Sequence, residues 1–152
     1  MEIRRPESGI TLIEMMIVVV IISLIAAVSA PALTSGLSSV RLSTASGSVA
    51  SFLTSTMNNV DRREQPVALE IDPKENHIAV FTARSGKVPE RQLHMPAGIT
   101  IEGDGLNRMI LMPGGVVPRI TVLLRNDKGS RRSIQIDPVT GVPLIQRVTE
   151  AK

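Results

Sequence analysis

The chain has 152 residues, of which 20% are charged and 43% hydrophobic, and this size and composition fit one ordinary domain. Cysteine is absent, which excludes disulfides, cysteine-based metal sites and cysteine nucleophiles. The formal net charge is +3, and Phe52 and Phe81 are the only aromatic residues, so the aromatic belt of a multi-pass membrane protein cannot be built.

A long apolar run lies near the N-terminus. No residue from Met15 to Val40 is charged, and a bilayer needs about 20 apolar residues, so this run predicts a single span followed by a water-soluble remainder. An ordinary secretory signal has its small-residue cleavage site after the apolar core. Here Ser8 and Gly9 precede the core. Removing a polar leader, residues 1–9, would leave the hydrophobic segment as the new N-terminus.

Glu14 lies near the start of this apolar segment, where a carboxylate in a spanning helix costs about 3 kcal/mol and needs a partner or a task. The stretch Gly9-Ile10-Thr11-Leu12-Ile13-Glu14, with the apolar run behind it, resembles the prepilin motif of type IV pilins and type II secretion pseudopilins. The resemblance implies that prepilin peptidase cuts after Gly9 and methylates the amine of Ile10.

The same resemblance gives Glu14 a role in assembly. Its carboxylate would neutralise the N-terminal amine of a neighbouring subunit when helices pack in a filament core. Low dielectric strengthens this attraction, and the loss of hydration offsets much of it, so the pair would set the register of packing more than add stability. The alternative is a plain signal anchor in which Glu14 has no such partner.

Two helical segments are expected, a transmembrane or filament-core helix over residues 10–33 and an amphipathic helix over residues 34–63. Pro31 removes one helical hydrogen bond and predicts a kink in the helix. Gln65 and Pro66 mark its end, because the residue before a proline avoids helical geometry. The serine-rich part could instead be a flexible linker. The helix reading rests on apolar residues spaced mostly three or four apart: Leu33, Leu37, Val40, Ala45, Val49, Phe52, Leu53, Thr56, Met57 and Val60.

Residues 64–152 change to a period of two and predict a strand-rich head, with turn residues between short strands. The predicted fold class is therefore α+β, a long kinked N-terminal helix packed against antiparallel strands in two small sheets. The expected strands are Val67–Ile71, His77–Ala83, Gly98–Glu102, Asn107–Met112, Arg119–Arg125, Arg132–Ile136 and Val142–Val148.

The closing stretch from Arg119 to Arg147 consists of a strand, a glycine turn, a strand, a threonine-glycine turn and a final strand. It is similar to the C-terminal region of GspH/FimT-type minor pilins. The resemblance implies a minor pseudopilin of a type II secretion system, anchored once in the bacterial inner membrane with its head in the periplasm. Its partners would be other pilin or pseudopilin subunits and prepilin peptidase, in a periplasmic or extracellular filament.

Residues with catalytic or metal-binding potential are sparse. His77 and His94 are the only histidines, without metal-ligand spacing, and each is expected at the surface or at a strand edge. No nucleophile elbow is present. The acids Glu102, Asp104, Asp127 and Asp137 are scattered over different turns, unlike a calcium loop. We therefore expect no enzyme, no cofactor and no metal site, with a membrane-anchored hydrolase as the alternative of another class.

The last third of the chain is basic, which raises nucleic acid as a partner. Some FimT-like pilins take up DNA through a Gly-Arg-x-Arg turn, but the corresponding turn here is Gly141-Val142-Pro143-Leu144. A FimT-like DNA-uptake pilin remains the alternative within the same class, and a basic face in contact with acidic subunits is the simpler reading. The residues of a possible DNA or partner contact are Arg125, Lys128, Arg131, Arg132 and Arg147.

Overall fold

The computed structural model describes residues 10–148. The chain divides into two compact units, one that ends at Gly36 and one that begins at Leu37. Helix α1, Leu12–Arg63, runs through both. The serine-rich part of the chain is therefore helical, and the interpretation as a flexible linker is not supported. The leader, residues 1–9, lies outside the described residues.

Helix α1 ends where the sequence predicted. Glu64 follows it with a φ of 51°, a left-handed conformation that stops helical hydrogen bonding, and Pro66 comes two residues later. The helix continues through Pro31. The side chains of Val28 and of residues 30–35 are not described, so the kink at Pro31 stays a prediction.

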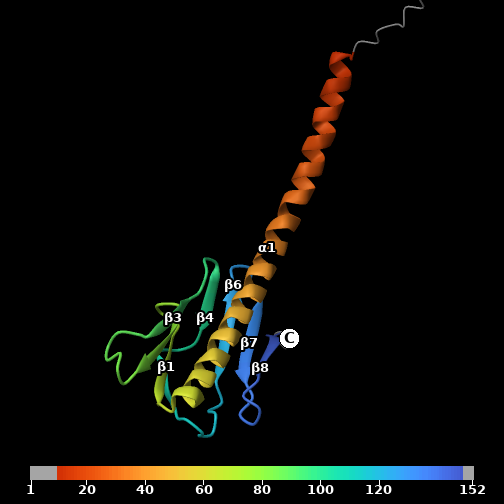
Figure 1. Ribbon diagram of the computed structural model, residues 1–152. Coiled ribbons are helices and arrows are strands. Elements are labelled where there is room, and N and C mark those ends of the chain that lie inside the picture. Colours follow the sequence, from red (N-terminus) through yellow and green to blue (C-terminus); the bar gives the residue numbers. More distant parts are fainter. Residues whose placement is uncertain (1–9, 149–152) are drawn as a thin grey trace, which may run out of the picture. The chain divides into compact units, whose positions relative to one another are not determined.

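The head contains two four-stranded antiparallel sheets, which confirms the predicted α+β class with an N-terminal helix and two sheets (Figure 1). Sheet A has the strand order β3-β2-β1-β5, and sheet B has the order β4-β6-β7-β8. The strands of sheet A are β1 (Val67–Asp72), β2 (His77–Thr82), β3 (Arg91–His94) and β5 (Asn107–Leu111). Those of sheet B are β4 (Ile99–Glu102), β6 (Thr121–Asn126), β7 (Arg131–Ile136) and β8 (Pro143–Val148).

Strand β3 is not among the strands predicted from the sequence. Its sequence, Arg-Gln-Leu-His, has one apolar residue, so it shows no alternation of apolar and polar side chains. Pairing with β2 defines it instead, with Ile78 opposite Leu93 and His77 opposite His94. Because β3 lies at the edge of sheet A, polar side chains on it remain in contact with water.

In the head, the C-terminal half of α1 lies beside the two sheets (Figure 1), and the core is made of buried residues from the helix and from both sheets. Leu53 on the helix, Leu69 and Ile78 in sheet A, and Leu124 and Ile134 in sheet B are each no more than 1% exposed. The two sheets are also joined by Asn76. Its side-chain amide donates to the carbonyl of Ile99 and accepts the N–H of Ile101, both at 2.8 Å, as a neighbouring strand would.

The buried face of α1 differs from the predicted stripe at its beginning. Leu37 and Val40 are 58% and 62% exposed, whereas Ser38 and Leu42 are buried. At about 100° per residue, Leu37 lies about 160° around the helix from Leu53, on the opposite side. The predicted stripe therefore joined two faces. Ser38 and Ser46 lie on the buried face of the helix, and their small side chains let the helix approach the strands.

Candidate assembly site

Helix α1 begins with a side-chain cap. The hydroxyl oxygen of Thr11 accepts the backbone N–H of Glu14 at 3.3 Å, and the carbonyl of Thr11 accepts the N–H of Met15 at the same distance. Thr11 and Glu14 have the spacing of a capping box, a signal in the sequence that could have located this helix start. The cap places the Glu14 carboxylate in the first turn of α1, where the helix dipole stabilises a negative charge.

The first turns of α1 expose an apolar surface on every side. Ile10 and Leu12 are 68% and 81% exposed, and all side chains from Ile10 to Ala27, Glu14 included, are exposed. Such a surface normally marks a site that another molecule or a lipid phase covers. Within the described part of the chain, no helix is both long enough and apolar enough to cross a membrane. The predicted cleavage position, Gly9, lies outside the described residues.

The structure separates the basic residues of the C-terminal third onto two faces of sheet B. Arg125 and Arg131 are opposite each other on β6 and β7, and both approach the carboxylate of Glu102. The Nε of Arg131 lies 3.0 Å from Glu102 Oε1, and the Nη1 of Arg125 lies 3.7 Å from the same oxygen. One carboxylate thus offsets part of the positive charge on this face.

Arg132 lies on the other face of β7 and donates from Nη1 to the hydroxyl of Ser43 on α1 at 3.1 Å. Arg147 lies opposite Arg132 on β8 and is exposed. Lys128 belongs to the turn between β6 and β7. The five predicted contact residues are therefore not one continuous basic surface, because alternate residues of a strand point to opposite faces.

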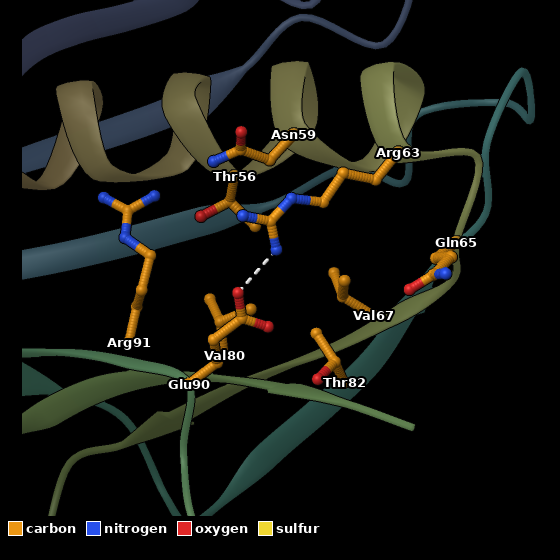
Figure 2. Close-up of a pocket in the computed structure, with 9 residues that line it drawn as sticks. All are labelled: Thr56, Asn59, Arg63, Gln65, Val67, Val80, Thr82, Glu90 and Arg91. Carbon is orange, nitrogen blue, oxygen red and sulfur yellow. Dashed lines mark hydrogen bonds and ion pairs between the residues drawn. The ribbon is translucent and has the colours of Figure 1, made fainter. Parts of the chain in front are cut away.

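A small cavity of about 30 Å³ lies between the last turns of α1 and sheet A (Figure 2). It has room for one or two water molecules. Arg63 donates from Nη1 to Glu90 Oε1 at 2.6 Å across it, and this hydrogen bond, followed by one from Thr82, holds the pKa of Glu90 below its usual value. Next to it, the Arg91 guanidinium lies 5.0 Å from the centre of the Phe52 ring. These contacts fasten the end of the helix to sheet A.

The prediction for His77 was wrong. His77 is 5% exposed, because β2 lies between β1 and β3 and places this residue between Asp72 and His94. His94, on the edge strand β3, is exposed as expected. Among residues 10–148, no group of three or more His, Asp or Glu side chains has the arrangement of a metal site.

Comparison with known families identifies the N-terminal segment. A family model described as the prokaryotic N-terminal methylation motif matches residues 4–30. This match covers Gly9, Ile10 and Glu14 and the first turns of α1, and it indicates an N-terminal segment of the type IV prepilin kind. No curated protein and no solved structure matches the chain.

Proposed function

We propose that this protein is a non-enzymatic filament subunit, a minor pseudopilin of a type II secretion system, which assembles through the N-terminal part of α1. The observation that carries the proposal is the methylation motif at residues 4–30, within which the apolar side chains from Ile10 to Ala27 are all exposed. The type II secretion role rests on the similarity of the C-terminal stretch to GspH/FimT-type minor pilins.

In this proposal, prepilin peptidase removes residues 1–9 and methylates Ile10. The apolar turns then lie in the inner membrane, with the head in the periplasm, until neighbouring helices cover them in the filament. Because lipid tails are as apolar as these side chains, moving them from the membrane to the filament gains little hydrophobic free energy, and association depends instead on close helix packing and on polar contacts between helices. Glu14 pairs with the N-terminal amine of a neighbouring subunit, and this pair fixes the axial position of one helix against the next.

Processing is tested by the intact mass of the protein from its own membranes. We expect the loss of MEIRRPESG and the gain of one methyl group, and an unprocessed protein in a strain that lacks the peptidase. A full-length N-terminus in the strain that has the peptidase would contradict the proposal.

Assembly is tested by Glu14→Gln, with Glu64→Gln as the matched control at an exposed carboxylate beyond the end of α1. We expect both variants to be processed and to reach the membrane, and only Glu14→Gln to be absent from isolated filaments. Incorporation of Glu14→Gln at the level of the unaltered protein would refute the role of this carboxylate.

DNA uptake as a FimT-like minor pilin is the second candidate, and the exposed Arg147 and Lys128 are the observation in its favour. Binding would be directed to the phosphate backbone and strongly dependent on salt. Retarded migration of short DNA at low salt, abolished by Arg147→Glu and Lys128→Glu together, would support it. DNA that migrates at the same rate with and without the protein at low salt would reject this function.

A further inference from the structure

His77 carries a buried ring nitrogen that makes no hydrogen bond within the described residues. Its side chain is 7% exposed, and within the described residues its Nδ1 has no hydrogen-bond partner. An unpaired buried polar atom costs about 1–3 kcal/mol, and such atoms are rare in native structures. The position of the surrounding groups suggests what this nitrogen is for.

The carboxylate of Glu75 lies beyond normal hydrogen-bond distance from this nitrogen. Nδ1 of His77 lies 3.5 Å from Oε2 of Glu75, whereas the donor and acceptor of an N–H···O hydrogen bond are usually about 2.7–3.2 Å apart. Two ligand atoms each about 2.0–2.2 Å from one zinc ion, at tetrahedral angles, lie about 3.4 Å apart. The observed separation of 3.5 Å is close to this value, and it is also that of an ion-pair contact between the two side chains.

A second imidazole, that of His94, lies next to His77 on the neighbouring strand β3. His94 on β3 is the register partner of His77 on β2, and the two ring centres are 5.4 Å apart with their planes tilted by 47°. If each ring centre lies about 3 Å from a shared ion, tetrahedral geometry separates the centres by about 5 Å. The spacing of the two rings is therefore close enough for one ion to be shared between them.

The turn between β1 and β2 holds Glu75 beside His77. The Oδ1 of Asp72 accepts the N–H of Lys74 at 2.8 Å and the N–H of Glu75 at 3.1 Å. Asn76 follows with a left-handed φ of 56°. The Glu75 side chain is 74% exposed, so it can rotate toward an ion without disturbing the core.

We propose that His77 and His94 bind one divalent transition-metal ion such as Zn²⁺, Cu²⁺ or Ni²⁺, with Glu75 rotating in as a third ligand and water completing the shell. Imidazole nitrogen suits these ions. Because the described residues hold no preassembled group of three ligands, the site forms from the histidine pair and closes on binding. The ion would hold the four-residue edge strand β3 to β2, and it would stabilise the folded head by RT ln(1 + L/Kd), where L is the free metal concentration.

The test uses the full-length protein in detergent, without a histidine tag, and Cu²⁺ as the probe. The chain has only two histidines, and both are in the proposed site, so the electron paramagnetic resonance spectrum reports directly on them. We expect one Cu²⁺ per chain coupled to two imidazole nitrogens. The double variant His77→Gln/His94→Gln measures binding elsewhere on the chain, including the N-terminal amine.

Single variants assign the ligands. His94→Gln, which replaces an exposed residue, is expected to leave one coupled nitrogen and to weaken binding about tenfold or more. Glu70→Gln, at another carboxylate of sheet A, is the matched control and should leave binding unchanged, whereas Glu75→Gln should weaken it. Coupling to fewer than two nitrogens, or the same affinity in His94→Gln, would overturn the site. The same affinity in Glu75→Gln would overturn the role of that carboxylate.

Discussion

Replacing Leu53 by alanine tests the packing of α1 on the sheets. Leu53 is 1% exposed within the core. Truncating a buried leucine removes apolar contacts and leaves a cavity, which costs about 2–5 kcal/mol. This is a large share of the 5–15 kcal/mol that folded domains typically have in total, about a third at the middle of both ranges. Helix propensity does not cause the loss, because alanine is the better helix former.

The measurement is urea unfolding of the full chain in detergent, followed by far-ultraviolet circular dichroism because the sequence has no Trp or Tyr. With a loss of about 3 kcal/mol and a slope of about 1.5 kcal/mol per M, the midpoint falls by about 2 M. Leu37→Ala is the matched control on the same helix, since Leu37 is 58% exposed, and its effect should stay within about 0.5 kcal/mol. Equal losses for the two variants would refute the assignment of the buried face.

Three further predictions concern the head. Asn126, buried at the β6–β7 turn, accepts two backbone N–H groups of that turn, so Asn126→Ala should cost about 1–3 kcal/mol in urea unfolding. Gly47→Ala should stabilise the head by about 0.5–1 kcal/mol, because Gly47 is helical and no atom lies where the added methyl group would be. Gly129→Ala should destabilise the head by about 1–2 kcal/mol, because Gly129 has a φ of 82°. Changes in stability of the same sign for both variants would contradict this. The lowered pKa of Glu90 means that its bond with Arg63 stabilises the fold above the unfolded pKa of about 4.3, and this contribution is lost as the pH falls through the folded value. Both side chains are partly exposed, so Glu90→Gln should cost less than about 1 kcal/mol at neutral pH and nothing in acid.

The arginines of sheet B show where sequence reading stops. Arg131 and Arg132 are adjacent in the sequence and look like parts of one basic surface. In the structure, Arg131 pairs with Glu102 and Arg132 contacts Ser43. Neighbouring residues of a strand face opposite sides, so the assignment of each arginine to a face depends on which strands lie beside it. The distance along the chain from Ser43 to Arg132 hides that contact from any local pattern.

The sequence by itself determined the features that depend on local order. The N-terminal motif, the end of the helix before Pro66 and seven of the strands follow from residue types and their spacing, because backbone preference and periodicity act over a few residues. The tertiary structure decided the features that depend on residues far apart: which face of α1 is buried, the existence of β3, and the burial of His77 opposite His94. These follow from strand pairing and from the packing of the helix on both sheets. Register across strands is set by the whole core, and no short stretch of the sequence contains it.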